Sequence, residues 1–340
     1  MHLVTGATGL LGSHIAEQLV LKGEKVRALV RPTSATAFLQ SIGVELRQGD
    51  LRDAASLRQA MQGVRVVHHA AAKVGDWGTR LEFQRDTIDG TRNIADACRA
   101  AGVLRLIHIS STSAYGHPEP SATPIDETRP LGDKFWMWDD YTRAKIAAEK
   151  IVWEALEKHG LGVTVIRPSW LYGPRDRLSI ARISNSLRTG RVKIIGDGTN
   201  QMNTVYAGNV AEACLLAAGQ PHANGQAYNI TKDGPLTQRE YFNLYADTLG
   251  YPRPTKHIPY PLAYAGGWLL ECIYRTCRFR RPPFITRYAA WLLGRQTIYS
   301  TEKAQRELGW QPLVGYQEGI AKTVAWYRDT AQGKCAKNHS

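Results

Sequence analysis

The chain has 340 residues, of which 43% are hydrophobic and 21% are charged, and its formal net charge is +13. This composition excludes a disordered, collagen-like or mini-protein class, and at ~100–200 residues per domain the length allows two lobes. The positive charge favours acidic ligands, nucleic acid or an anionic membrane surface as partners.

The cysteines and the first residues of the chain indicate the cellular compartment in which we expect the protein. The five cysteines include no Cys-x-x-Cys pair, which favours a reducing compartment without disulfides, and no Cys/His spacing predicts a metal site. The glycine motif begins five residues after Met1 and leaves no room for a signal peptide, so we expect a cytoplasmic protein.

Short apolar, β-branched runs alternate with amphipathic stretches through the first half of the chain. This alternation predicts an α/β fold, a Rossmann-type doubly wound parallel sheet with helices on both faces. We expect residues 203–231 to return to this core, the rest of 171–330 to form a smaller, mostly helical cap, and 331–340 to be a flexible tail. Strands are expected at 3–5, 25–30, 44–48, 64–69, 103–110 and 163–167, and helices at 15–21, 54–61, 91–101 and 141–159.

The segment from Thr5 to Gly12, Thr-Gly-Ala-Thr-Gly-Leu-Leu-Gly, lies between the first strand and the first helix. Its glycines permit a tight turn and let backbone N–H groups approach a pyrophosphate at the helix N-terminus. The alternative is an ordinary glycine-rich turn, but the position directly after the first strand favours a nucleotide site. We therefore expect residues 1–170 to bind NAD or NADP, with contacts from Gly6, Thr8, Gly9, Leu10, Leu11 and Gly12.

The second strand ends at Arg31, with no carboxylate in the residues that follow. An acidic residue at this point would bind the ribose hydroxyls and select NAD, whereas a cation suits a 2′-phosphate. Arg31 therefore favours NADP over NAD, with a solvated surface arginine as the alternative.

Further cofactor contacts are expected where the next strands end. Asp50, beside Leu51, is placed to accept a hydrogen bond from the adenine amino group; a turn or N-cap role is the alternative. Ala70 and Ala71 allow a backbone to pass close to the cofactor, or a tight helix–sheet contact. Leu51 and Pro168 complete the expected cofactor contacts.

Tyr141 and Lys145 are four residues apart and therefore share one helix face. A tyrosine hydroxyl titrates near ~10, so it needs a nearby cation to act as an acid–base group at neutral pH. Ser111 follows the fifth strand, and ligands of open α/β sheets bind at the carboxyl ends of strands. A hydroxyl there can bind a substrate oxygen. The alternatives are an exposed helix face and serines that only cap loops.

Taken together, these motifs resemble the extended short-chain dehydrogenases/reductases over nearly the whole chain, from Thr5 to about Arg328. The glycine motif, the run 110–116, Tyr141-x-x-x-Lys145, Arg167-Pro168 and 172–174 occur in family order. The resemblance implies that Tyr141 is the catalytic acid/base, that Lys145 lowers its pKa and binds the nicotinamide ribose, and that Ser111 is the catalytic hydroxyl. Thr87 departs from the family, which usually has Asn there.

The second half is most similar to the 3β-hydroxysteroid dehydrogenase branch, through segments 196–200, 205–210, 228–231 and 308–312. This branch includes sterol-4α-carboxylate 3-dehydrogenases and 2-alkyl-3-oxoalkanoate reductases. The resemblance implies an NAD(P)-dependent oxidoreductase that transfers hydride between nicotinamide and a secondary alcohol or ketone of a bulky apolar substrate. Lys73 is then a candidate contact for a substrate carboxylate, with a solvated surface lysine as the alternative.

Two other functions remain open on the same scaffold. A nucleotide-sugar epimerase or dehydratase needs groups for a diphosphate, for which Arg175, Arg177 and Arg182 are candidates, although Ser169-Trp170 stands where such enzymes often carry Asn. A non-catalytic NADP-sensing regulator would not need the acid–base residues. Nucleic acid is not expected as a partner, because no helix combines Arg and aromatic residues in a base-reading pattern.

Segment 258–295 combines apolar and basic residues. Residues 258–270 contain no charged side chain, but this run is shorter than the ~20 residues of a spanning helix. From Cys272 to Thr301 there are six arginines (275, 278, 280, 281, 287 and 295) and no acidic residue. An interfacial membrane element, a wall of an apolar substrate pocket and an ordinary core helix all fit this pattern. A homodimer is also left open.

Overall fold

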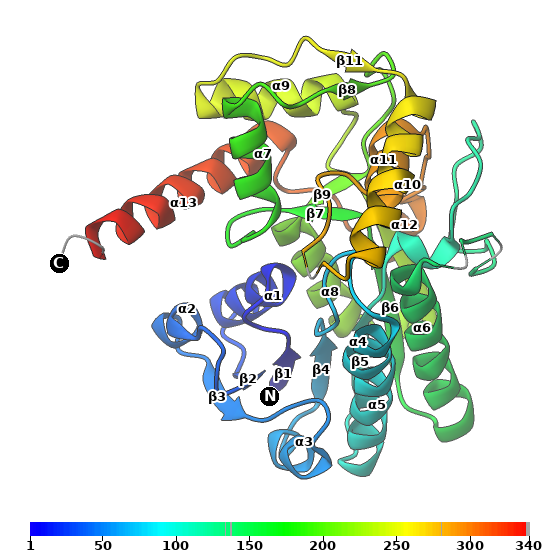
Figure 1. The fold of residues 1–340 in the computed structure, drawn as a ribbon. Coiled ribbons are helices and arrows are strands. Elements are labelled where there is room, and N and C mark those ends of the chain that lie inside the picture. Colours follow the sequence, from blue (N-terminus) through cyan, green and yellow to red (C-terminus); the bar gives the residue numbers. More distant parts are fainter. Residues whose placement is uncertain (133, 137, 280, 338–340) are drawn as a thin grey trace.

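The computed structural model describes residues 1–132, 134–136, 138–279 and 281–337. A seven-stranded sheet forms the centre, in the order β10-β6-β5-β4-β1-β2-β3, and every pair of neighbours is parallel (Figure 1). The doubly wound α/β fold is therefore confirmed. The strands are β1 (His2–Thr5), β2 (Val26–Val30), β3 (Glu45–Gln48), β4 (Val66–His69), β5 (Arg105–Ile109), β6 (Val163–Pro168) and β10 (Gln226–Ile230).

Helices cover both faces of the sheet because successive strand side chains point to opposite sides. One apolar layer contains Val4 and Ile107, the other Leu3 and Leu106. The first layer packs against α1 (Leu10–Leu21), α8 (Ala207–Gly219) and α12 (Glu302–Leu308), and the second against α3 (Ala54–Ala60), α5 (Gly90–Ala100) and α6 (Asp140–His159). Shorter helical pieces are α2 (Ala37–Ser41), α4 (Arg80–Phe83), η1 (Gln84–Asp89), η2 (Thr112–Tyr115) and η3 (Pro221–Ala223).

The chain leaves the sheet after β6 and comes back twice. The first return is the one predicted from the sequence, and it consists of helix α8 and strand β10. The second return is α12 with Trp310, which is only 1% exposed and belongs to the same apolar layer as α1. The sequence analysis did not anticipate this second return.

The rest of the second half forms a smaller, mostly helical lobe above the carboxyl ends of the strands (Figure 1). Helix α13 continues through Lys337, so the predicted tail is helical up to that residue, and 338–340 lie outside the described residues. The lobe comprises α7 (Ser179–Arg188), α9 (Gln238–Leu249), α10 (Tyr260–Thr276), α11 (Arg287–Gly294), α13 (Tyr316–Lys337) and the strand pairs β7 (Trp170–Tyr172) with β9 (Thr204–Tyr206), and β8 (Ile194–Ile195) with β11 (His257–Ile258).

A buried ion pair joins α6 to the sheet. Glu149 of α6 is 0% exposed and accepts hydrogen bonds from Arg167 Nε of β6 at 3.1 and 3.2 Å. Its carboxylate also accepts bonds from Ser110 Oγ at 2.6 Å and from Trp153 Nε1 at 3.2 Å. Arg167 in turn donates to Tyr115 Oη at 2.7 Å. Each charge therefore has its counter-ion and further hydrogen-bond partners, which offset the cost of removing the pair from water.

We expect Glu149→Gln to lower the free energy of unfolding by about 3 kcal/mol or more, because it leaves the Arg167 charge buried without its counter-ion. Urea denaturation measures this change. Glu154→Gln is the matched control on the same helix, since Glu154 is 53% exposed and its pair with Lys158 spans 3.9 Å. The control should stay within about 0.5 kcal/mol of wild type. Equal stability of the two variants would contradict an anchoring role.

Candidate active site

The loop from β1 to α1 forms a close-packed cradle of backbone. Gly6 has a φ of 68°, and a Cβ at this position would lie 2.8 Å from Ala71 N. A Cβ on Gly12 would lie 2.2 Å from the Gly6 carbonyl oxygen, so only glycine fits there. Gly9 is the N-cap of α1, and the N–H groups of the first turn after it, beginning at Leu10, have no acceptor within the helix. This cradle fits the pyrophosphate of a dinucleotide.

Of the six residues expected in this loop, all lie between the end of β1 and the first turn of α1. Thr8 is half-buried, and the Leu11 side chain points into the apolar layer of the core. Leu11 can therefore contribute only its backbone to a bound phosphate.

A series of polar contacts joins the loop after β4 to the ends of β1 and β4 and to α5. Ala71 N donates to Thr5 Oγ1 at 3.3 Å, and Thr5 Oγ1 lies 2.8 Å from His69 Nδ1. The other ring nitrogen of His69 lies 3.1 Å from Thr91 Oγ1 of α5. Burial lowers the pKa of His69 to about 3, so the ring is neutral at physiological pH. These contacts hold Ala70 and Ala71 against Gly6, and the sequence analysis missed both His69 and Thr91.

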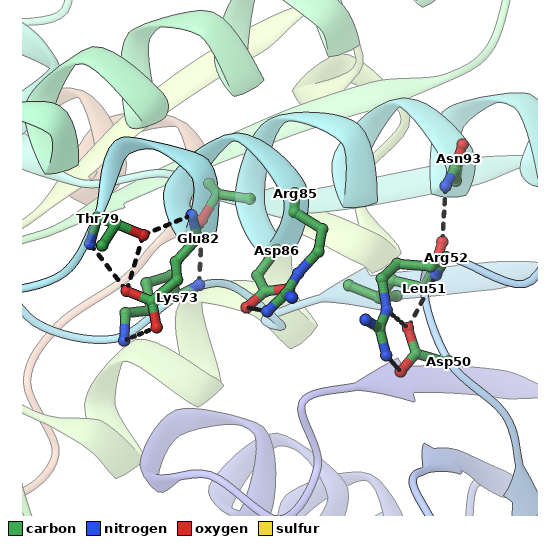
Figure 2. A network of polar contacts seen from close by, with 10 residues as sticks. Asp50, Leu51, Arg52, Lys73, Thr79, Glu82, Arg85, Asp86 and Asn93 are labelled. Atoms are coloured by element: carbon green, nitrogen blue, oxygen red, sulfur yellow. Dashed lines mark hydrogen bonds and ion pairs between the residues drawn. The ribbon is translucent and has the colours of Figure 1, made fainter.

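Two arginines, Arg31 and Arg52, lie in the region where the sequence analysis expects the adenosine of the cofactor. Arg31 is exposed directly after β2. Asp50 is held by Arg52, whose Nε and Nη2 donate to its two carboxylate oxygens at 2.8 and 2.7 Å (Figure 2). Hydrogen bonds from Arg52, with a smaller effect of the Arg31 charge, lower the pKa of Asp50 to about 2. A cavity of about 410 Å³, lined in part by Pro32 and Ser56, opens beside Asp50.

The sequence analysis gave a turn role and an N-cap role as the alternatives to adenine binding for Asp50, and the structure distinguishes between these two. The N-cap of α3 is Asp53, which accepts a bond from Ala55 N at 2.9 Å, so an N-cap role for Asp50 is wrong. Asp50 instead closes a turn, because its Oδ1 also accepts a bond from Arg52 N at 3.0 Å. Its Oδ2 retains acceptor capacity for the expected adenine amino group. Leu51 next to it accepts a bond from the Asn93 side chain at 2.8 Å.

The three expected catalytic residues meet where β5 ends. Ser111 caps η2, and its Oγ accepts a bond from Ser113 N at 3.1 Å. Helix α6 begins at an N-cap, Asp139, and presents Tyr141 and Lys145 on one face. Lys145 Nζ donates to the carbonyl oxygen of Ile109, the last residue of β5, at 3.0 Å. Pro168 ends β6, the next strand of the sheet, and is buried.

The electrostatic surroundings of Tyr141 keep its proton in place. Burial raises the pKa of the Tyr141 phenol above its ordinary value. The hydroxyls of Ser111 and Ser113, which face the phenol, oppose this increase in pKa, whereas the charges of Asp139 and Asp76 add to it. Tyr141 is therefore protonated at neutral pH, the state required to donate a proton to a ketone.

Lys145 supplies the cation on the same helix face. Burial lowers the pKa of Lys145 to about 8, and the Glu149 carboxylate one turn away acts in the opposite direction. The ammonium is therefore charged in most molecules at neutral pH.

Aromatic side chains from both lobes surround Tyr141. Its ring centroid lies 6.3 Å from that of Phe83 and 6.2 Å from that of Tyr288 in α11. Tyr288 also faces Trp291, with the ring centroids 6.1 Å apart. A cavity of about 20 Å³ beside Tyr288 is lined by Trp136 and by charged side chains. Segment 258–295 thus contributes a wall of the site through α11.

The loop after β4 also borders the site, since the charge of its Asp76 acts on Tyr141. Lys73 N donates to Thr87 Oγ1 of η1 at 3.0 Å, so the residue that departs from the family pattern pins this loop. The Lys73 ammonium lies 3.7 Å from Glu82 Oε1, and both side chains are partly exposed (Figure 2). Lys73 therefore has an intramolecular partner, in agreement with the surface interpretation.

Glu149 is a third residue that the sequence analysis missed, after His69 and Thr91. It follows Lys145 by four residues, as Lys145 follows Tyr141, so one helix face carries all three. A search of α6 at this spacing would have found it. Among the described residues, no group of three or more His, Cys, Asp or Glu side chains could hold a metal ion.

Comparisons with known proteins agree with this geometry. A 2-alkyl-3-oxoalkanoate reductase of Stenotrophomonas maltophilia is 36% identical over 330 residues, which cover 95% of this chain and 98% of the relative. The mouse sterol-4-alpha-carboxylate 3-dehydrogenase, decarboxylating, is 31% identical and the match covers 97% and 92%. The crystal structure of a Thermus thermophilus UDP-glucose 4-epimerase in complex with NAD superposes with a TM-score of 0.74, at 26% identity and coverages of 96% and 98%.

The model of one family matches residues 2–231, which include the glycine cradle, the end of β5 and the Tyr141–Lys145 face. That family is described as the NAD dependent epimerase/dehydratase family, and its nicotinamide cofactor is the dinucleotide that the cradle fits. The chain therefore belongs to the NAD dependent epimerase/dehydratase family, among the extended short-chain dehydrogenases/reductases that its motifs resemble.

Proposed function

We propose that the protein is an NADP-preferring oxidoreductase that transfers hydride between nicotinamide and a secondary alcohol or ketone of a bulky apolar substrate. The substrate class is a 3β-hydroxysteroid or a 2-alkyl-3-oxo or 3-hydroxy acid. The observation that carries this proposal is the meeting of Ser111, Tyr141 and Lys145 beneath an aromatic wall. The names of the reductase and dehydrogenase relatives support the substrate class.

Each of the three residues has a defined task. Ser111 Oγ accepts a bond from a backbone N–H, so its own hydrogen is available to donate to the substrate oxygen. In the direction of reduction, Tyr141 gives its proton to that oxygen, and in the direction of oxidation its phenolate takes the proton back. The Lys145 charge stabilises the phenolate and binds the nicotinamide ribose. The nicotinamide supplies or accepts the hydride when it is bound.

The preference for NADP rests on the charges at the adenosine end. No carboxylate follows β2, where one would select NAD. Arg31 is exposed at this point, and Arg52 lies nearby in a pair with Asp50. The guanidinium of Arg31 suits a phosphate on the ribose.

The contacts of Arg175 count against a nucleotide-sugar epimerase. This side chain was a candidate for a substrate diphosphate, but its Nε donates to Ser13 Oγ at 2.8 Å and its Nη2 donates to Glu17 Oε2 at 2.5 Å. Its guanidinium also stacks over Phe38, 4.1 Å from the ring centroid. Arg175 thus joins the cap to α1. The assembled acid–base group also counts against a regulator that only senses NADP.

A turnover screen tests the proposed function. NADPH and NADH are each supplied with steroid ketones and 2-alkyl-3-oxo acids, and the nicotinamide absorbance is followed. Nucleotide sugars are incubated with NAD or NADP and their products are separated by chromatography, because epimerisation and dehydration leave no net change in the nicotinamide. We expect turnover with at least one of the first two classes. Conversion of nucleotide sugars alone would contradict the proposal.

We expect Tyr141→Phe to reduce kcat by about 10²–10⁴-fold while NADPH still binds, because the phenylalanine cannot exchange a proton with the substrate oxygen. Steady-state kinetics and a fluorescence titration with NADPH measure the two effects. Tyr327→Phe, which removes a hydroxyl on α13, is the matched control. A Tyr141→Phe enzyme within about tenfold of wild-type kcat would rule out the acid–base role.

We expect kcat/KM for ketone reduction to fall as the pH rises through about 8. This parameter reports groups of the free enzyme, and Lys145, whose pKa is about 8, loses its charge in that range. Lys145→Arg keeps the charge at every accessible pH, so any activity it retains should not show this fall. A wild-type profile that stays flat to pH 10 would contradict the assignment.

Arg31→Asp should weaken NADPH binding by about tenfold to a hundredfold and NADH binding much less, because it replaces a phosphate partner by a like charge. The dissociation constants and kcat/KM for both cofactors measure this selectivity. Lys25→Asp is the control, since Lys25 is exposed next to the opposite end of β2. Equal kcat/KM for the two cofactors in the wild type would refute the NADP preference.

A further inference from the structure

The outer face of α10 carries a stripe of uncovered apolar side chains. Leu262 is 61% exposed, Trp268 51%, Leu269 54% and Ile273 45%. Leu262, Leu269 and Ile273 recur at spacings of seven and four residues and therefore line one side of the helix, with Trp268 next to Leu269 at its margin. Ala263 and Gly267 are buried on the side that packs against α11. The stripe therefore runs along most of the helix.

The stripe continues into the turn that follows α10. Phe279 is 52% exposed and Phe284 is 70% exposed. Six of the thirteen exposed large hydrophobic side chains in the described part of the chain thus fall within residues 262–284. Concentration of this kind marks a contact surface, since isolated exposed apolar residues are normally scattered.

The charge of this surface is of one sign. Glu271 is the only acidic residue of α10, and it points inward, where Arg287 N and Nε donate to its carboxylate at 2.8 and 2.6 Å. Arg275, Arg278 and Arg281 are exposed at the end of the helix and in the turn. Arg280, which also belongs to the cluster in the sequence, lies outside the described residues. The outward face is therefore apolar and cationic.

The arginine-rich turn adjoins the loop after β4. Trp77 Nε1 donates to the carbonyl oxygen of Phe279 at 3.3 Å, and the guanidinium of Arg275 lies 5.0 Å from the centre of the Trp77 ring. These contacts fix the turn to the Rossmann core. The apolar stripe and the arginines are thus held on one supported surface.

We propose that α10 and the turn to Phe284 bind the surface of an anionic lipid bilayer. The helix lies in the plane of the interface, with Leu262, Trp268 and Leu269 at the boundary between headgroups and acyl chains and the arginines among the headgroup phosphates. Helix α10 has 17 residues, fewer than the ~20 that a spanning helix needs, so it would lie on the membrane surface. No helix in the described part of the chain is long and apolar enough to cross a membrane.

Charge complementarity selects lipid over a second copy of the chain. In a two-fold interface the same patch meets itself, so the arginine clusters of both copies would be brought together without an acidic partner. An anionic bilayer supplies apolar depth and negative charge at once. Binding then depends on both parts of the surface, and salt weakens it.

The test is co-sedimentation of the full chain with vesicles of phosphatidylcholine alone or with phosphatidylglycerol, at low and high salt. We expect binding to the anionic vesicles at low salt, weakened at least about tenfold by high salt or by omission of phosphatidylglycerol. Two double variants, Trp268→Ser with Leu269→Ser and Arg278→Glu with Arg281→Glu, should each weaken binding by at least about tenfold. Their matched controls are Leu21→Ser with Leu104→Ser and Arg188→Glu with Arg191→Glu, which alter exposed residues elsewhere and should bind as wild type.

A second measurement does not depend on the folding of the double variants. Brominated phosphatidylcholine in the anionic vesicles should quench the tryptophan fluorescence of the wild type, and Trp268→Phe should remove most of that quenching. Absence of binding, or equal loss in test and control variants, overturns the proposal. So does a dimer in size-exclusion chromatography that Trp268→Ser with Leu269→Ser converts to a monomer without vesicle binding, because the surface is then an interface between copies.

Discussion

The buried pair between Glu149 and Arg167 is the contact on which the geometry of the site depends. Arg167 belongs to β6, Glu149 to α6, and the Glu149 carboxylate also accepts a bond from Ser110, the residue before Ser111, which we propose as the catalytic hydroxyl. One carboxylate thus fixes the distance between a strand end and a helix. The desolvation of two ions is costly, and only the full set of hydrogen-bond partners offsets it. A site that requires fixed positions benefits from such an anchor.

The same carboxylate also supports the charge of the site. Lys145 lies one turn before Glu149, and burial alone would favour its neutral form. Glu149 acts against that effect, so the lysine stays charged near neutral pH. Tyr141 lies one more turn away, in a position where burial raises its pKa. Structural anchoring and charge balance are therefore two consequences of one residue.

The parts of this architecture that are local in sequence were predictable, and the parts that depend on long-range contacts were not. Strand–helix alternation predicts the sheet, because most of its strands are short runs rich in apolar side chains, and the bounds of the six expected strands lie within two residues of those observed. Ser111, Tyr141 and Lys145 follow from motif order. The partner of Glu149 is 18 residues away, and the contact between His69 and Thr91 spans 22 residues, so neither leaves a periodic signal.

The second half illustrates the same limit. Residues 302–308 are a polar, amphipathic helix by sequence. The burial of Ala304, Leu308 and Trp310 in the core shows that this helix packs on the sheet and does not belong to the cap. For segment 258–295 the sequence left three interpretations open, because an apolar run does not say which side of a helix is covered. The structure separates them by helix, since α11 contributes Tyr288 to the wall of the site while α10 keeps an apolar face outside.

The pair between Glu271 and Arg287 explains how these two helices differ. It lies between α10 and α11, where both side chains are less than a tenth exposed, and the Arg287 guanidinium also stacks on Trp138, 3.9 Å from the ring centroid. Glu271 is thereby kept off the outer surface, which would otherwise carry a negative charge beside the arginines. One ion pair thus joins α10 to α11 and also keeps the only carboxylate of α10 away from its outer face. The wall of the site on α11 and the cationic apolar surface on α10 are therefore parts of one folded unit.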